Sequence, residues 1–225
     1  NAFVVSGIVA ICYLLSTGYT ALNGPLYATD NSIAGAFWAT NSVIVIAFLV
    51  FYSRLMLSLI GDYENKLKDA ALKDQLTGLY NRRYMQDELE RVSTEGKEYF
   101  LAMVDIDDFK HINDQYGHNA GDYILSNVAR IMTDTCTKSR ISRWGGEEFL
   151  ILTSGPVSGT GLELIETLRK RIESEVFVFE DTHISVTITS GLAEFTADRS
   201  VDKWVDEADD KLYIGKGSGK NKVVV

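Results

Sequence analysis

Two groups of carboxylates lie at the ends of apolar runs that are typical of buried strands. Asp105, Asp107 and Asp108 follow "FLAMV", and Glu147 and Glu148 precede "FLIL". Carboxylates gathered at strand ends repel one another unless a cation holds them. Mg²⁺ suits such a site, because it takes one or two protein carboxylates and completes its octahedron with water and phosphate oxygens. The residues therefore indicate a magnesium site, with a solvated acidic loop as the alternative.

Three lysines extend this chemistry toward phosphates. Lys110 follows the first group of acids, and Lys216 and Lys220 lie in "GKGSGKN" near the C-terminus. Lysines beside carboxylates indicate a phosphate chain that shares its site with a metal ion. The segment "GKGSGK" is not a P-loop, because its glycine spacing differs and it follows a predicted helix.

Gly145 and Gly146 directly precede the second pair of acids, in "RWGGEEFLIL". A two-residue Gly-Gly loop readily takes the positive φ values of primed hairpin turns and leaves no side chain over the turn. We therefore expect a tight hairpin whose backbone a phosphate-bearing ligand can approach. Taken alone, the two glycines are better explained by a plain turn.

Helical and strand patterns alternate around these residues from about Asp74 onward, and they predict an α+β fold. The tight hairpin favours a central mixed or antiparallel sheet flanked by helices over a purely parallel one. Helices are expected at "NRRYMQDELERVS", opened by Asn81, and at "AGDYILSNVARIMTD", "GLELIETLRKRIES" and "VDKWVDEADDKLYIGK". Strands are expected at "YFLAMVDI", in the hairpin "ISRWGGEEFLIL", and over the whole of "HISVTITSGLAEF".

The composition restricts the classes of partner. A net charge of −9 and a pI near 4.9 disfavour a nucleic-acid partner, which usually binds a basic face. Two cysteines, Cys12 and Cys136, provide neither a disulfide framework nor zinc-ligand spacing, which favours a reducing compartment.

Residues 1–53 are expected to form a membrane region with one or two transmembrane helices. They contain no Lys or Arg and a single acid, Asp30. The twenty uncharged residues from Ile33 to Tyr52 are long enough to cross a hydrocarbon core of about 30 Å. An uncharged run over 1–22 is a second candidate span; a signal peptide is the alternative, but no basic segment precedes it. Because the chain opens on Asn1, we expect it to be part of a longer protein.

Basic residues after the second run set the expected orientation, because Arg54, Lys66, Lys68 and Lys73 follow it and none lies between the runs. The positive-inside rule then places the C-terminal part in the cytoplasm, and we expect the protein to lie in the inner membrane. Residues 54–73 are expected to form a helical stalk. Its apolar residues recur at steps of four and three, as in a two-stranded coiled coil: Met56, Ile60, Tyr63, Leu67 and Ala70. A solitary amphipathic helix is the alternative.

Five motifs in residues 74–225 carry a resemblance to a known family. They are "DQLTGLYNRR", "VDIDDFKHINDQYGHNAGD", "RWGGEEF", "SGLA" and "ADDKLYIGKGSGKN", in this order. The segment resembles a GGDEF domain, the diguanylate cyclase family that condenses two GTP into cyclic di-GMP. The signature reads "GGEEF" in this chain, with Glu147 at the third position, where the family's name GGDEF has aspartate.

The resemblance implies roles for the residues at the metal and the phosphates. Asp105, the carbonyl of Ile106 and Glu147 would hold Mg²⁺ or Mn²⁺, with help from Glu148. Glu147 would also serve as the base for the attacking 3′-hydroxyl. Lys110 and Lys216 would contact phosphates, as would Lys220, which stands where many members carry arginine.

The resemblance also implies the remaining substrate contacts. Asn113 and Asp122 match the pair that reads guanine, with His118 nearby, and Asp108 and Phe109 are expected to contact the substrate. A carboxylate can accept from both the ring N–H and the exocyclic amine of guanine, which adenine does not offer together. Each domain would hold one GTP, so catalysis would require a homodimer. A domain that binds nucleotide without turnover is the alternative.

A product-binding inhibitory site is not expected. Many diguanylate cyclases carry an Arg-x-x-Asp motif that ends four residues before the signature arginine. In this chain the two positions are Cys136 and Ser139, counted back from Arg143. Neither can replace its counterpart, because a thiol has no fork of donors and a hydroxyl has no charge.

Overall fold

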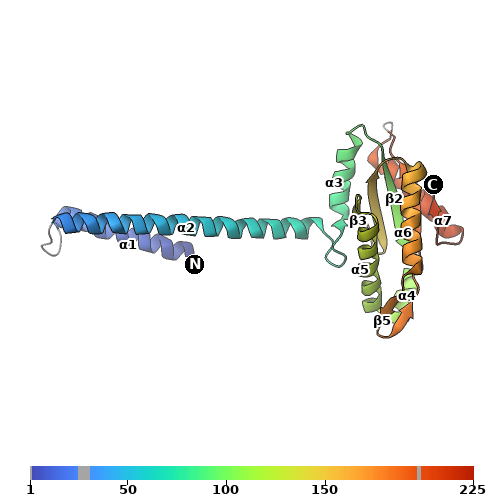
Figure 1. Cartoon of the computed structure of the whole chain (residues 1–225), viewed down its shortest axis with the longest axis horizontal. Helices are drawn as coiled ribbons and strands as arrows, with labels where there is room; N and C mark the ends of the chain where they lie inside the picture. Colours follow the sequence, from blue (N-terminus) through green and yellow to red (C-terminus); the bar gives the residue numbers. More distant parts are fainter. Residues whose placement is uncertain (1, 25–30, 197–198) are drawn as a thin grey trace. The chain divides into compact units, whose positions relative to one another are not determined.

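The computed structural model describes residues 2–24, 31–196 and 199–225, and the chain divides into two compact units, Asn1–Glu64 and Asn65–Val225 (Figure 1). The first unit consists of helix α1 (Ala2–Asn23) and the N-terminal part of helix α2 (Asn31–Leu72). Within this unit the two helices are in contact through Tyr13 and Trp38, whose rings meet edge to face at 6.3 Å.

One stretch of α2 has the length and composition of a membrane span. Over the described residues, Trp38–Ile60 is the segment that meets both criteria, with a mean hydropathy of 2.4 over 23 residues. Large apolar side chains such as Ile44, Phe48 and Phe51 are exposed along it. This segment overlaps the predicted second span, whereas α1 does not meet the same criteria within its described residues.

The predicted stalk lies within α2, which is helical through Leu72. Met56 is half-buried and Ile60 is exposed in the single chain. The side chains of Tyr63, Leu67 and Ala70 lie outside the described residues. The coiled-coil seam therefore stays a prediction.

The second unit is a mixed six-stranded sheet with helices on both faces (Figure 1). Its strands follow the order β1-β3-β4-β2-β7-β8; the three central pairings are antiparallel and the two edge pairings are parallel. This arrangement confirms the predicted α+β fold with a mixed sheet. The elements are β1 (Tyr80–Asn81), α3 (Arg82–Ser93), β2 (Tyr99–Ile106), α4 (Phe109–Tyr116), α5 (His118–Thr135), β3 (Arg140–Arg143), β4 (Glu148–Ser154), a turn (Val157–Gly161), α6 (Leu162–Ser174), β5 (Phe177–Phe179), β6 (Thr182–Ile184), β7 (Ile188–Glu194), α7 (Val201–Gly217) and β8 (Val223–Val224).

The central strand β2 is buried along its whole length, because both faces of the sheet are covered. Phe100, Ala102 and Val104 pack into a core formed with α4, α5 and α6. Leu101 and Met103, which point to the other face, pack with α3 and α7. This double coverage explains why the run "YFLAMV" is apolar without interruption. The last residues of β2, Asp105 and Ile106, lie at the end of this buried strand.

Helix α7 packs closely against β7 at Gly191. A Cβ atom at this position would lie 2.1 Å from the carbonyl oxygen of Ala208 and 2.3 Å from the amide nitrogen of Leu212. Only glycine therefore allows this approach, which explains the small residue in "SGLA".

Two expectations about local structure are wrong, and one helix was missed. The segment between β3 and β4 spans residues 144–147, so the loop is longer than two residues, and neither Gly145 nor Gly146 has positive φ. The strand expected over "HISVTITSGLAEF" is two strands, because β6 leaves the main sheet to pair with β5 while β7 joins β2. Helix α4, which follows the acids of β2, was not anticipated.

Candidate active site

The two groups of carboxylates converge at the end of β2. Asp105 is paired with Glu148 across the antiparallel β2–β4 ladder. The amide of Ile106 donates to the carbonyl of Glu147 over 3.4 Å. The register of the sheet, which the apolar residues on both sides fix, thus brings the acids of β2 next to those of the signature hairpin.

The signature hairpin is held by its own backbone and by Arg143. The amides of Trp144 and Gly145 donate to the carbonyl of Glu148 over 2.8 and 3.2 Å. The guanidinium of Arg143 donates to the carbonyl of Gly146 over 2.7 and 3.0 Å and forms an ion pair with Asp74 at 3.2 Å. Asp74 also accepts from the amide and hydroxyl of Thr77, so the "DQLT" turn and the hairpin are tied together.

A cavity of about 160 Å³ opens beside these carboxylates. It gathers residues from the end of β2, the start of α4, the hairpin and the loop after α7. Its lining consists of Asp105, Ile106, Asp107, Asp108, Phe109, Lys110, Glu147, Lys216 and Lys220. Asp107 was expected only as one of the clustered acids, all the others were predicted site residues with a role, and the fold brings them to one place.

Two of the three lysines that line the cavity form ion pairs with carboxylates. The ammonium of Lys216 lies 2.8 Å from Oδ2 of Asp105, and that of Lys220 lies 2.5 Å from Oδ1 of Asp108. The hydrogen bond to Asp108 raises the pKa of Lys220 above its ordinary value. Lys110 is exposed in the first turn of α4. Three lysines and four carboxylates therefore line the cavity together.

Asp105 is the most electrostatically perturbed acid of the site. Burial raises its pKa to about 6, Lys216 opposes the rise, and the charges of Glu147 and Glu148 add to it. Its residue surface is only 3% exposed, which is costly for an anion without a full set of partners. The site is thus prepared for additional positive charge.

Asp107 has a different function from its neighbours. Its carboxylate accepts from the hydroxyls of Thr187 and Thr189 at 2.7 and 2.6 Å and from the amide of Asn221 at 3.0 Å. These bonds occupy both oxygens and join the end of β2 to the loop after α7. Asp107 is therefore a structural acid, although the sequence places it in the same group as Asp105.

The donors at the cavity suit a hard divalent cation. Carboxylates of Asp105 and Glu147 and the carbonyl of Ile106 are oxygen ligands of the kind that Mg²⁺ takes. Within the described part of the chain, no three acidic, histidine or cysteine side chains are grouped closely enough to hold a metal by themselves. A magnesium ion here would consequently need oxygens from a phosphate-bearing ligand, as is common for this ion.

The predicted guanine-reading residues lie at the corner between α4 and α5. Asn113 is on α4, while His118 and Asp122 are exposed on the first turns of α5. A Cβ atom at Gly121 would lie 2.0 Å from Oδ1 of Asn113, so the carboxamide rests directly on the glycine. Gly121 was missed by the sequence reasoning, and its lack of a side chain leaves the space that the carboxamide of Asn113 occupies.

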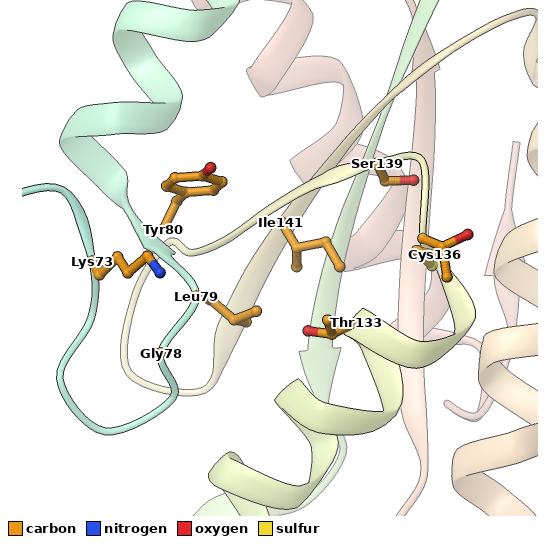
Figure 2. A pocket seen from close by; sticks show the side chains of 9 residues that line it. Lys73, Gly78, Leu79, Tyr80, Thr133, Cys136, Ser139 and Ile141 are labelled. Carbon is orange, nitrogen blue, oxygen red and sulfur yellow. The ribbon is translucent and has the colours of Figure 1, made fainter. Parts of the chain in front are cut away.

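The position of the family's inhibitory motif is occupied by inert groups. Cys136 is buried, which raises the pKa of its thiol to about 12, and the hydroxyl of Ser139 accepts from Thr153 over 2.6 Å. Figure 2 shows both residues beside a cavity of about 200 Å³ whose lining includes Lys73 and Tyr80 but neither arginine nor aspartate. The neighbouring Arg140 is held in an ion pair with Glu88.

Residues 71–222 match the family described as diguanylate cyclase, GGDEF domain. The chain belongs to this family. The chain is 34% identical over 186 residues to diguanylate cyclase DgcM of Escherichia coli, with 78% of this chain and 45% of DgcM covered. It is 35% identical over 163 residues to DgcP of Pseudomonas aeruginosa, with 70% and 24% covered. The chain thus spans less than half the length of these relatives.

Solved structures of GGDEF proteins resemble the chain as well. The coiled coil and GGDEF domain of DgcB from Caulobacter crescentus, in complex with c-di-GMP, superposes with a TM-score of 0.74 at 27% identity. The alignment covers 80% of this chain and 98% of that one. The active GGEEF domain of a diguanylate cyclase from Vibrio cholerae superposes with a TM-score of 0.58 at 27% identity, covering 64% and 95%.

Proposed function

We propose that the chain is a diguanylate cyclase that condenses two GTP into cyclic di-GMP and releases pyrophosphate. The observation that carries the proposal is the single cavity in which Asp105, Glu147, Lys110, Lys216 and Lys220 meet within a GGDEF domain. Every position that the family uses for metal, phosphate and base contacts has a chemically competent residue. This completeness argues against the alternative, a domain that binds nucleotide without turnover.

The chain's own residues perform most of the proposed chemistry. Lys216 and Lys220 bind the triphosphate, and Lys110 stabilises charge that develops on the phosphates. Glu147 accepts the proton of the 3′-hydroxyl as this oxygen attacks the α-phosphorus of the second GTP, and the bond to the β-phosphate oxygen breaks. Asn113 and Asp122 read the guanine.

Asp105, Glu147 and the Ile106 carbonyl would hold Mg²⁺ or Mn²⁺, with Glu148 close by. Such an ion neutralises the triphosphate and supplies the positive charge that the buried carboxylates lack. In the chain by itself, Lys216 fills part of this role through its ion pair with Asp105. An ion held by Asp105 would compete with this pair and would leave Lys216 available to the phosphates.

The proposal includes a dimer and a membrane input. Each domain has one site, so two copies must face each other for each GTP to attack the other. The exposed apolar stretch Trp38–Ile60 supports anchoring in the inner membrane, with the domain in the cytoplasm by the distribution of Lys and Arg. The stalk over residues 54–73 would then carry a signal from the membrane to the catalytic encounter.

The test is Glu147→Gln in the full chain, assayed for cyclic di-GMP from GTP and Mg²⁺ by chromatography. The substitution removes a ligand charge and the base at constant volume, so synthesis should fall by about 100-fold or more. Glu163→Gln, the same change at an exposed position of α6, is the matched control and should retain the parental rate. A Glu147→Gln variant as fast as the control would refute the proposed role of the cavity.

A further inference from the structure

A set of side-chain hydrogen bonds joins α6 to the loop that carries Lys220. Arg169, on α6, donates to Oε2 of Glu173 and to Oδ1 of Asn221 at 2.9 and 2.7 Å. The carboxamide nitrogen of Asn221 in turn donates to Oε1 of Glu173 over 2.6 Å. Glu166 accepts from Nε of Arg169 at 2.9 Å and fixes the guanidinium plane. The carboxamide is therefore held on both its oxygen and its nitrogen by one arginine and one glutamate.

The backbone of Asn221 is fixed at a third point. Its amide donates to Oδ2 of the buried Asp107, which the hydroxyls of Thr187 and Thr189 hold in place. Lys220 and Asn221 both adopt positive φ, 60° and 46°, a region that non-glycine residues rarely occupy. Two such residues in succession persist only where the surroundings determine the conformation, and here the three contacts of Asn221 do so.

Lys220 depends on this conformation for its place in the cavity. Its neighbours Gly217 and Gly219 leave the loop with little stiffness of its own, and Gly219 also has positive φ. The lysine side chain nevertheless reaches across to Oδ1 of Asp108 at 2.5 Å, at the edge of the cavity that Lys216 and Asp105 share. The amide of Lys220 donates to the carbonyl of Gly215 over 3.1 Å and holds the loop to α7 on one side, while the contacts of Asn221 hold it to α6 and to Asp107 on the other.

We propose that Arg169, Glu173 and Asn221 are positioning residues that hold Lys220 toward the triphosphate. The proposal rests on the proposed function, since it assigns a phosphate to Lys220. None of the three lines the cavity, so they act through the loop backbone. Their removal should weaken nucleotide binding more than it slows the chemical step.

The first test is Asn221→Gly in the full chain. Glycine adopts positive φ freely and keeps the amide that donates to Asp107, so it deletes only the contacts with Arg169 and Glu173. We expect KM for GTP to rise about tenfold, which is the loss of affinity that corresponds to one charge-assisted hydrogen bond. The contact supports the binding of substrate and transition state alike, so kcat should change less than about twofold. Glu163→Gln on the same helix is the control and should leave both constants unchanged.

The second test exchanges the partners. Asn221→Asp keeps the acceptor for Arg169 but sets a second carboxylate against Glu173, so KM should rise. Adding Glu173→Gln exchanges the two groups: the amide at position 173 can now donate to the carboxylate at position 221, and the net charge is again that of the parent. KM should therefore return toward the parental value. A merely structural contact would not show this rescue in KM. Failure of the double variant to recover, with a normal melting temperature, would overturn the proposal.

Calorimetry with 3′-deoxy-GTP and Mg²⁺ separates this proposal from the proposed function. The analogue lacks the attacking hydroxyl, so its affinity reports binding even in a chain that makes no product. We expect Asn221→Gly to bind it about tenfold more weakly than the parent. Equal affinity would reject the positioning role, whether or not the parent makes cyclic di-GMP.

Discussion

Asp105 is a carboxyl group that the fold buries before any ligand binds. Its pKa is about 6 in the folded chain, against an ordinary value of 3.8, because burial outweighs the attraction of Lys216. A raised pKa means that the folded state binds more protons than the unfolded state between these two values. The group therefore lowers stability as the pH rises from 3.8 through 6, and the full cost is present above pH 6.

We accordingly expect Asp105→Asn to stabilise the nucleotide-free chain at pH 7.5 while it abolishes synthesis. The difference between 3.8 and 6 corresponds to about 3 kcal/mol. This difference already includes the attraction of Lys216, and solvent screening at the open side of the cavity reduces it to an expected gain of about 1–2 kcal/mol. Melting temperatures of parent and variant at pH 7.5 and 5.0 check the prediction. The gain should be roughly halved at pH 5.0; a constant gain would mean that the Asp105 charge is not its cause.

Cys136 and Ser139 predict the absence of feedback by product at the family's inhibitory position. A buried thiol and a hydroxyl already bonded to Thr153 offer no paired donors or charge to a guanine or phosphate. Arg140 cannot replace the missing arginine, because Glu88 holds it. Initial rates with cyclic di-GMP added at micromolar concentrations should stay within about twofold of the rate without it. This is the concentration range in which a site with a paired arginine and aspartate would bind the product. The double variant Cys136→Arg, Ser139→Asp should become sensitive, and strong inhibition of the parent would contradict the argument.

At the scale of elements, the close contact of β7 and α7 fixes where the phosphate-binding loop begins. Gly191→Ala would force its Cβ into the backbone of α7 near Ala208 and Leu212. We expect a loss of about 3 kcal/mol or more in unfolding free energy, because a helix backbone cannot yield as a side chain does. Chemical denaturation measures the effect. Gly217→Ala, at the end of the same helix with open space around its Cβ, should change stability by less than about 1 kcal/mol.

Elements with their own local signals could be predicted from the sequence. Asn81 caps α3 by accepting from the amide of Tyr84, as its position before the helix indicated. The apolar run of β2 was recognised for the same reason, since a strand covered on both faces must be apolar throughout. The residues that line the cavity followed from the family motifs, because those motifs lie at the ends of these elements.

Elements that depend on distant partners could not be predicted. Strands β1 and β8 are two residues long and exist only through pairing with β3 and β7. Helix α4 begins after Asp108, which has positive φ and no side-chain cap, so the usual start signal is absent. The linkage of Asp107 and Asn221 spans over a hundred residues of sequence, and only the folded sheet reveals that Asp107 differs in role from Asp105.

At the scale of the whole molecule, the proposed function makes activity depend on how two chains meet, because the product would require two phosphodiester bonds and the site of each chain would supply one GTP and one base. If α2 pairs with its counterpart in a second chain, it would raise the local concentration of the second domain. The sequence spacing of Met56, Ile60 and Leu67 along α2 is that of such a pairing seam.

Leu67→Lys tests whether this seam assembles the active dimer. Paired lysines at a seam position would bring like charges together in an apolar interface, so the dimer should weaken and activity at low protein concentration should fall by about tenfold. Asn65→Lys adds the same charge at a position that the heptad count places on the outer face, and it should behave as the parent. Specific activity is measured against protein concentration together with sedimentation in detergent. Raising the concentration of Leu67→Lys should restore its rate, because the catalytic domains are unchanged. If Leu67→Lys and Asn65→Lys have the same activity at every concentration, the domains find each other without the stalk.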